Sequence, residues 1–333
     1  KFVYAHGSTN GDPNFEKWKY PANNGIRKYL HKIKAKTYYN HINKYFAGRP
    51  DHLEHFSYAK YYEPTPLPKE LADADIIHLH QIDNFLDYPS FFSSIPDKTP
   101  VIWSLHDMEP FTGGCHYSWT CDQYKDACTS CPQLGEYDNK KLANQNLALK
   151  KEILSERDFH VVANCDWTQA ESHNSSLFKL ANKVHKVHYG IELDQFVPLD
   201  RDACRKALNI PEGAFCISFG SADIANRRKG FVEMLKVLEI LADEGLNIYC
   251  LIFGQGGELM EEVNIPRIDL GFIQSPELQS LVYSASDLFV MTTLYDALPQ
   301  TVLESLACGT PVVGFRTGGI PDMIILDRTG FLI

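Results

Sequence analysis

Residues 295–322 read YDALPQTVLESLACGTPVVGFRTGGIPD, and this stretch decides the fold of the chain. A helix is expected to begin near Pro299, because proline lacks the N–H that a first helical turn leaves unbonded. Gly309 is expected to end that helix, and the run PVVGF then predicts a buried strand. A helix that begins just beyond a strand presents free N–H groups and the positive end of its dipole. The stretch therefore predicts an anion-binding site.

Two acidic residues, Asp296 and Glu304, stand eight positions apart and flank the start of this helix. Carboxylates on both sides of an anion site can accept hydrogen bonds from hydroxyl groups at both ends of a phosphate-centred ligand. A sugar nucleotide has that order of groups: sugar, diphosphate, ribose. We therefore expect the rest of the chain to build this site and a second half to face it.

The segment upstream supplies positive charge for the same ligand. FCISFGS (215–221) predicts a strand, and an amphipathic helix with a clear apolar face is expected between Phe231 and Gly245. Arg227, Arg228 and Lys229 precede that helix and are suited to neutralising phosphates. A solvated basic turn is the alternative. GQGG (254–257) follows the next strand but lacks the third spaced glycine of a dinucleotide fingerprint.

The first half of the chain also alternates strands with helices. Strands are predicted at 74–80 and 99–107, a helix at 139–155 and a further strand at 159–164, which is typical of a doubly wound parallel sheet. The second strand ends in His106-Asp107, which places His106 at the carboxyl end where such sheets bind ligands. His78 and His80 are interpreted as structural. We expect an amino-terminal domain at 1–190 and a carboxyl-terminal domain at 191–333.

A cysteine-rich insertion is predicted at 113–135. Cys115, Cys121, Cys128 and Cys131 follow the spacing C-x5-C-x6-C-x2-C, and a closing CxxC is half of many tetrahedral zinc sites. Four thiolates would fill the coordination shell, so the zinc would be structural. A reduced cluster that packs the loop and a redox disulfide are the alternatives.

Composition indicates a globular protein of 333 residues with a net charge of −10. No run of eighteen apolar residues occurs, and five scattered cysteines suit a reducing cytoplasm. Nine basic residues and no acidic ones lie in the segment 17–49, a candidate contact with the anionic inner face of a cell membrane. A solvated helix face is the alternative, and no nucleic-acid-binding module is evident. Because Lys1 is not an initiator methionine and the chain halts just after the strand-like run GFLI (330–333), we expect the protein to extend beyond both ends.

The chain resembles a GT-B glycosyltransferase of the retaining family-4 type, similar to bacterial enzymes of exopolysaccharide, colanic-acid or O-antigen synthesis. Nearly the whole chain shares the resemblance. Its motifs are HDMEPFTGGCHYSWTC (106–121) with CTSCPQLG (128–135), RRKGF (227–231), GFI (271–273) with SASDLFVMTT (284–293), and the block 296–322. The fold implied is α/β, with two Rossmann-like doubly wound parallel-sheet domains facing a cleft.

The resemblance also implies roles for individual residues. Glu304 matches the second acid of the family's Glu-x7-Glu element, which holds the ribose hydroxyls. Asp296 matches the first acid, near the donor sugar, but is one methylene shorter than the family's glutamate. His106 resembles the acceptor-facing histidine, so the catalytic residues implied are His106, Asp296 and Lys229. The further donor-binding residues implied are Gly220, Arg227, Arg228, Ile273, Leu298, Pro299, Gln300 and Thr301.

The reaction implied moves a sugar from a UDP-, GDP- or ADP-sugar to a hydroxyl of a glycan or a lipid-linked acceptor, with no catalytic metal. The family's glycine-rich first loop and its last helix have no counterpart here. The family's arginine after the strand glycine is also absent, since Ser221 follows Gly220. An epimerase or phosphorylase of the same fold remains an alternative, as does a non-catalytic sugar-nucleotide-binding or scaffold subunit.

Overall fold

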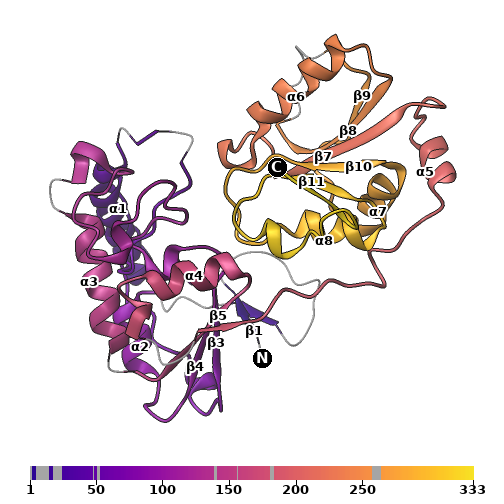
Figure 1. Cartoon of the computed structure of the whole chain (residues 1–333). Helices are drawn as coiled ribbons and strands as arrows, with labels where there is room; N and C mark the ends of the chain where they lie inside the picture. Colours follow the sequence, from indigo (N-terminus) through magenta and orange to yellow (C-terminus); the bar gives the residue numbers. More distant parts are fainter. Residues whose placement is uncertain are drawn as a thin grey trace. The chain divides into compact units, whose positions relative to one another are not determined.

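The computed structural model describes residues 2–4, 15–17, 25–47, 49–50, 53–138, 141–155, 157–180, 184–256 and 264–333. The chain forms two compact units (Figure 1). Unit 1 comprises 1–50, 54–162 and 172–184, and unit 2 comprises 51–53, 163–171 and 185–333. In the part of the chain that the structure describes, no helix combines the length and apolar character needed to cross a membrane.

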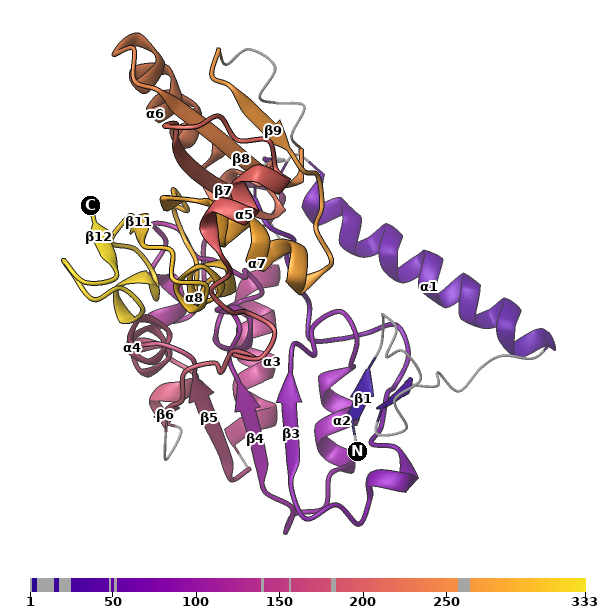
Figure 2. The same ribbon diagram turned by 90° about the vertical axis from the view of Figure 1, so that its right-hand side faces the viewer.

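Unit 1 is built on a four-stranded sheet with the order β3-β4-β5-β6. Its strands are β3 (Ile77–His80), β4 (Val101–Ser104), β5 (Phe159–Ala163) and β6 (Val184–Lys186), and a separate parallel pair joins β1 (Phe2–Tyr4) to β2 (Phe15–Lys17). Strands β3, β4 and β5 are parallel and lie side by side in Figure 2. The helices are α1 (Gly25–Phe46), α2 (Tyr88–Ser94), α3 (Leu142–Ser155) and the end of α4 (Asp166–Asn174).

Unit 2 is built on a six-stranded parallel sheet with the order β12-β11-β10-β7-β8-β9. Its strands are β7 (Phe215–Asp223), β8 (Ile248–Gln255), β9 (Arg267–Asp269), β10 (Leu288–Met291), β11 (Val312–Gly314) and β12 (Gly330–Leu332). The helices are α5 (Arg201–Ala207), α6 (Phe231–Asp243), α7 (Pro276–Ala285) and α8 (Gln300–Ala307). The chain runs outward from β7 through β9, returns to β10 and runs outward again. This order has a switch point between β7 and β10.

The core of unit 2 follows the alternation of its strands. Successive side chains of a strand point to opposite faces. In β10, Phe289 packs in one buried apolar cluster and Val290 in the other. In β7, Cys216 and Ile217 divide between the two clusters in the same way. Both faces of the sheet are therefore apolar, as expected for a parallel sheet.

The predicted α/β class with two parallel sheets is confirmed. Helix α1 runs from Gly25 to Phe46, within the basic segment 17–49. Helices α2 and α4 are not among the predicted elements. Helix α2 is seven residues long and begins at a cap in which Asp87 accepts the N–H of Ser90. Helix α4 reads DWTQAESHN and has no clear apolar face in its sequence, so no amphipathic pattern marks it as a helix.

A glycine fixes the contact between the loops that follow β7 and β10. Gly230 has φ +73°, and a Cβ atom there would lie 1.7 Å from the carbonyl oxygen of Thr292. Thr292 Oγ1 donates a hydrogen bond of 2.7 Å to the carbonyl oxygen of Gly230. Only glycine allows this close approach of the two backbones.

We expect Gly230→Ala to lower the free energy of unfolding by about 3 kcal/mol, because it combines left-handed strain with a backbone clash. Gly213 has the same φ of +73° but nothing within 4 Å of its Cβ position. Gly213→Ala is therefore the matched control and should cost about 1 kcal/mol. Urea unfolding followed by circular dichroism compares the two variants. Equal losses of unfolding free energy in the two variants would show that the close approach of Gly230 to Thr292 does not contribute to stability.

Candidate active site

Open parallel sheets bind ligands beyond the carboxyl ends of their strands, at the switch point. In unit 2 the loops that follow β7 and β10 meet there. The backbone N–H of Leu294 and the hydroxyl of Thr293 both donate hydrogen bonds to the carbonyl oxygen of Arg228, at 2.8 and 2.9 Å. Together with the contact between Gly230 and Thr292, these bonds join the two loops into one surface.

Opposite charges meet on this surface. Lys229 Nζ donates a hydrogen bond of 2.6 Å to Asp296 Oδ2, and Arg228 Nη1 donates one of 3.0 Å to the same oxygen. Arg228 Nη1 also lies 2.7 Å from the carbonyl oxygen of Tyr295. Burial raises the pKa of Asp296, but the charges of Lys229 and Arg228 outweigh it, so this pKa lies below its ordinary value. Two cations around one carboxylate leave a net positive charge.

Arg227 does not join this group. Its two terminal nitrogens donate to the two carboxylate oxygens of Glu233, in the first turn of α6, at 2.7 and 2.8 Å. This bidentate pair fixes the short 3₁₀ turn Arg227–Lys229, which Asn226 caps through its side chain. The structure thus brings Arg228 and Lys229 to Asp296, while Arg227 holds the turn that presents them.

The helix predicted to bind an anion begins beside Asp296. Pro299 is the residue before α8, and no side chain caps the helix there. The N–H groups of Gln300 and Thr301, in the first turn, can therefore serve another acceptor. Leu298 is buried beneath the loop and anchors it to the core of unit 2.

A pair of glycines supports the loop from below. A Cβ atom on Gly318 would lie 1.7 Å from the carbonyl oxygen of Asp296, and one on Gly319 would lie 1.9 Å from that of Ala297. The N–H of Gly319 donates to the carbonyl oxygen of Asp296 at 3.1 Å. Gly318 and Gly319, near the end of the stretch 295–322, therefore set the backbone position of Asp296.

Glu304 lies in the second turn of α8. The hydroxyl of Tyr283, from α7, donates a hydrogen bond of 2.8 Å to Glu304 Oε2. Burial raises the pKa of Glu304, while the bond from Tyr283 opposes that rise. Within the described residues, Oε1 has no hydrogen-bond partner. One carboxylate oxygen is thus held in place and the other is available to a ligand hydroxyl.

Gly220 and Ile273 lie in the same unit but outside this polar group. Gly220 is in β7, and a Cβ atom there would lie 2.5 Å from the ring of Phe253. Ile273 follows β9 and is buried in the same apolar cluster as Phe253. Gly220 has no side chain and that of Ile273 is buried, so any contact with a ligand would come from the backbone.

His106 lies in unit 1, two residues beyond the end of β4. His80 Nδ1 and His106 Nε2 are 2.9 Å apart. Burial lowers the pKa of His106 and, with the charges of His78 and His106, lowers that of His80 to about 4. The alternation of His78 and His80 with apolar residues favoured a structural role for His80. Its position as the last residue of β3, next to β4, was the available signal that it contacts His106.

The four cysteines of the insertion line one small cavity of about 20 Å³ in unit 1. The backbone N–H groups of Gln133 and Leu134 lie near the sulfur of Cys131 and lower its pKa, and that of Gly113 does the same for Cys128. Burial raises the pKa of Cys128 to about 11 and also raises those of Cys115 and Cys131. All four thiols are free of disulfide bonds.

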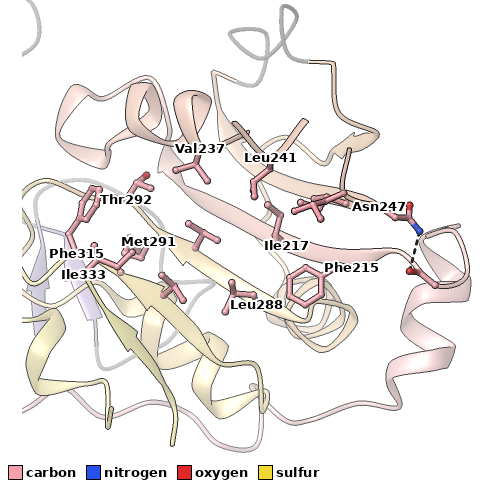
Figure 3. A pocket seen from close by; sticks show the side chains of 16 residues that line it. Phe215, Ile217, Val237, Leu241, Asn247, Leu288, Met291, Thr292, Phe315 and Ile333 are labelled. Carbon is pink, nitrogen blue, oxygen red and sulfur yellow. Dashed lines mark hydrogen bonds between the residues drawn. The ribbon is translucent and has the colours of Figure 1, made fainter. Parts of the chain in front are cut away.

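A larger pocket of about 590 Å³ opens on one face of the sheet of unit 2 (Figure 3). Its lining is almost wholly apolar and includes Phe215, Ile217, Leu241, Leu288 and Phe315. None of the sequence-predicted site residues lines it. No charged side chain lines this pocket, so it lacks the cations that a diphosphate requires, and the candidate site remains at the switch point.

The comparisons with known proteins agree with this fold. Residues 200–333 match the family "Glycosyl transferases group 1". In solved structures, the chain is similar to sucrose-phosphate synthase from Thermosynechococcus elongatus, with a TM-score of 0.58 and 18% identity over 93% of this chain and 80% of that one. It is also similar to HepE of Anabaena in complex with UDP-glucose, with a TM-score of 0.55 and 17% identity over 80% and 66%.

Curated relatives match over a shorter region. D-inositol 3-phosphate glycosyltransferase 1 of Catenulispora acidiphila is 29% identical over 45% of this chain and 40% of its own length. Sulfoquinovosyl transferase SQD2 of Arabidopsis thaliana is 32% identical over 46% and 30%. The chain thus matches less than half the length of these relatives. It contains a glycosyltransferase group 1 domain, and the predicted GT-B fold is confirmed.

Proposed function

We propose that this chain is a retaining glycosyltransferase that moves a sugar from a nucleoside-diphosphate sugar to an acceptor hydroxyl. One observation carries the proposal: Arg228 and Lys229 meet Asp296 at the switch point, beside the uncapped start of α8. A surplus of positive charge next to free helix N–H groups is a site for a diphosphate. The family match of residues 200–333 supports the same assignment.

The chemical barrier to sugar transfer is charge, since the sugar becomes cationic as the diphosphate departs. Lys229 and the first N–H groups of α8 stabilise the negative charge that grows on the leaving phosphate. The side chain of Lys229 is 21% exposed, against 11% for that of Arg228. Lys229 is therefore the cation that a ligand reaches more readily, while Arg228 holds the loop through Tyr295.

Asp296 has two tasks in this proposal. Before the donor binds, it neutralises part of the cationic charge and keeps Lys229 positioned. Once the diphosphate arrives, Lys229 is shared between the phosphate and Asp296. The carboxylate can then accept a hydrogen bond from a hydroxyl of the donor sugar.

Glu304 would hold the ribose of the nucleotide. A cis-diol donates two hydrogen bonds, which suits a carboxylate that is already oriented by Tyr283. Because Tyr283 occupies Oε2, the ribose would bind mainly at Oε1. The donor then extends along the start of α8 from Glu304 to Asp296, in the order ribose, diphosphate, sugar.

His106 would face the acceptor. Its lowered pKa keeps the imidazole neutral near pH 7, so it can accept or donate a single hydrogen bond to an acceptor hydroxyl. Its contact with His80 fixes the ring. The departing phosphate takes the acceptor proton, which needs no catalytic metal.

We propose a glycan or lipid-linked acceptor in bacterial surface polysaccharide synthesis, at the cytoplasmic side of the cell membrane. Among donors, a UDP-sugar is the first to test, because HepE was solved with UDP-glucose; GDP- and ADP-sugars complete the panel.

One observation favours a second candidate, a non-catalytic sugar-nucleotide-binding subunit. Asp296 is shorter than the family's glutamate and is already paired with Lys229.

Lys229→Ala should lower turnover by about a hundredfold or more, the loss expected for one preorganised charge contact on a developing anion. The measurement is nucleoside diphosphate released from UDP-, GDP- and ADP-sugars, with and without acceptor. Lys236→Ala, which removes an exposed lysine on α6, is the control and should leave turnover unchanged. Near-normal turnover in Lys229→Ala contradicts the assigned role. A wild-type chain that binds a donor but leaves it intact is the non-catalytic subunit.

We also propose that Cys115, Cys121, Cys128 and Cys131 bind a structural zinc ion. The support is their shared cavity and the N–H groups that lie near two of the sulfurs. No three of the four sulfur atoms, all in the described part of the chain, lie within 4.8 Å of one another. Zinc would draw the four sulfur atoms around that cavity. The ion would then connect the two ends of the insertion.

Cys128→Ser should retain one zinc ion fewer per chain than the wild type and should melt at a lower temperature, because metal binding contributes to folding. Metal analysis and thermal melting of purified protein measure both effects. Ser130→Ala, an exposed change between the closing cysteines, is the control. Equal zinc content and equal melting in wild type and Cys128→Ser would exclude the site.

A peripheral contact with anionic membrane is proposed for α1. Lys32, Lys34 and Lys36 are exposed, and Tyr29 and Leu30 are exposed at 67% and 50%. Exposed basic side chains are attracted to an anionic lipid surface. Arg49, from the same basic segment, instead donates hydrogen bonds to the carbonyl oxygens of Glu54 and Gln133.

The double variant Lys34→Glu and Lys36→Glu should bind vesicles containing phosphatidylglycerol about tenfold more weakly or worse, since each lysine near such a surface contributes about 1 kcal/mol. Co-sedimentation at low salt measures the affinity. A pair of exposed lysines elsewhere, Lys98 and Lys236, reversed to glutamate, corrects for net charge. Equal loss in both double variants would point to non-specific attraction.

A further inference from the structure

A second group of metal-ligating side chains lies in unit 1, outside the cysteine cluster and the proposed transfer chemistry. In the described part of the chain, His55, Asp83 and His116 form the one group of three or more His, Cys, Asp or Glu residues whose ligand atoms all lie within 4.8 Å of one another. The three residues are far apart in the sequence. The fold must therefore explain why they meet.

Two acidic residues, Asp83 within this group and Asp107 beside it, follow the neighbouring strands β3 and β4. His80 of β3 pairs with Ser104 of β4 in the parallel register. Asp83 and Asp107 each follow three residues beyond this pair, so they emerge at the same carboxyl edge of the sheet. That edge is where open parallel sheets place their ligand-binding groups.

The two histidines are brought together by a backbone bridge. Phe56 pairs with Cys115 in an antiparallel bridge, and the N–H of Ser57 donates to the carbonyl oxygen of Gly114 at 2.8 Å. The bridge sets the residues next to it, His55 and His116, side by side, with ring centroids 4.2 Å apart. His116, which belongs to the cysteine-rich insertion 113–135, is thus placed at the edge of the sheet.

The spacing of the ligand atoms fits a single ion. Asp83 Oδ2 lies 3.6 Å from Nε2 of His55 and 3.6 Å from Nε2 of His116. Two ligands that are each about 2.1 Å from one zinc ion stand roughly 3–4 Å apart. Both separations from Asp83 are in this range, and the two histidine nitrogens lie within 4.8 Å of each other, so the three atoms can approach one ion.

The neighbouring contacts orient the buried ligand. Asp107 Oδ2 lies 2.7 Å from His116 Nδ1, so the carboxylate accepts the proton of that nitrogen and leaves Nε2 to face the group. Metal-binding histidines are commonly fixed by such a carboxylate. Ser57 Oγ lies 3.1 Å from Asp83 Oδ2 and 2.8 Å from His116 Nε2. An ion would replace the contact with Nε2, while the hydroxyl keeps its bond to Asp83.

The three side chains differ in burial, so that solvent can reach the group from one side. The side chains of His116 and Asp83 are 5% and 12% exposed, whereas that of His55 is 66% exposed. Two ligands are thus held in the protein and the third lies at the surface. Three protein ligands leave at least one coordination position for water or for an oxygen of a bound molecule.

We propose that His55 Nε2, Asp83 Oδ2 and His116 Nε2 form a binding site for a divalent transition-metal ion of the zinc type. Two imidazoles and one carboxylate select zinc and its first-row neighbours over calcium and magnesium, which prefer oxygen ligands. Asp107 is a positioning residue for His116. The site is separate from the cysteine cluster, and the proposed sugar transfer does not require it.

Cobalt(II) is the probe, because its bonds to thiolate sulfur give intense near-ultraviolet absorption that nitrogen and oxygen ligands do not. Full-length protein is stripped with a chelator, dialysed and titrated with Co²⁺, and bound metal is counted by elemental analysis. His55→Ala should weaken binding at this site at least about tenfold and leave any thiolate absorption unchanged. The control His173→Ala removes an exposed histidine on α4 and should bind as the wild type does.

Asp107→Asn provides a second, independent readout. It should keep the stoichiometry at saturation but weaken Co²⁺ affinity about tenfold to a hundredfold, as loss of an orienting carboxylate does. Because His55 is at the surface, its variant is expected to fold even if an Asp107 variant does not. The proposal is overturned if wild type and His55→Ala bind Co²⁺ with the same affinity and stoichiometry. The group would then be a hydrogen-bonded network without metal.

Discussion

The carboxylate of Asp296 is almost fully buried, and its charge is tolerated because Lys229 and Arg228 donate hydrogen bonds to the same oxygen. This ion pair requires that the loops after β7 and β10 approach closely. Gly230 permits one backbone contact and Gly318 permits another. The sheet order, the two glycines and the cationic turn thus all serve the placement of one acid at the switch point.

The two units use the same edge of a parallel sheet for different chemistry. In unit 2 the strand ends carry cations and a helix start, which suit an anionic ligand. In unit 1 the strand ends carry His106 with His80 on one side and Asp83 with Asp107 on the other. Histidine and carboxylate suit hydroxyl groups and cations. The backbone arrangement of the two sheets is the same. The two units therefore differ in ligand preference because different polar residues lie at the ends of their strands.

Much of the fold could be predicted from the sequence, because each buried parallel strand and each amphipathic helix has a pattern of apolar residues within one contiguous segment. The start of α8, Glu304 and the basic turn could be located in this way. The partner of Arg227 could not, because bidentate pairing with Glu233 depends on side-chain geometry. The meeting of His55 with His116 was also beyond the sequence, since it depends on the bridge between Phe56 and Cys115.

Helix α4 begins in unit 2 and ends in unit 1, because 163–171 groups with unit 2. The thiol of Cys165 donates to the carbonyl oxygen of Ala297, and the N–H of Asp166 donates to the carboxylate of Asp322. A fragment that began at residue 200 would lack this segment and expose the backbone beside Asp296. The nucleotide-site unit is therefore discontinuous in the chain. During synthesis, residues 163–171 cannot form these contacts until Ala297 and Asp322 have been made.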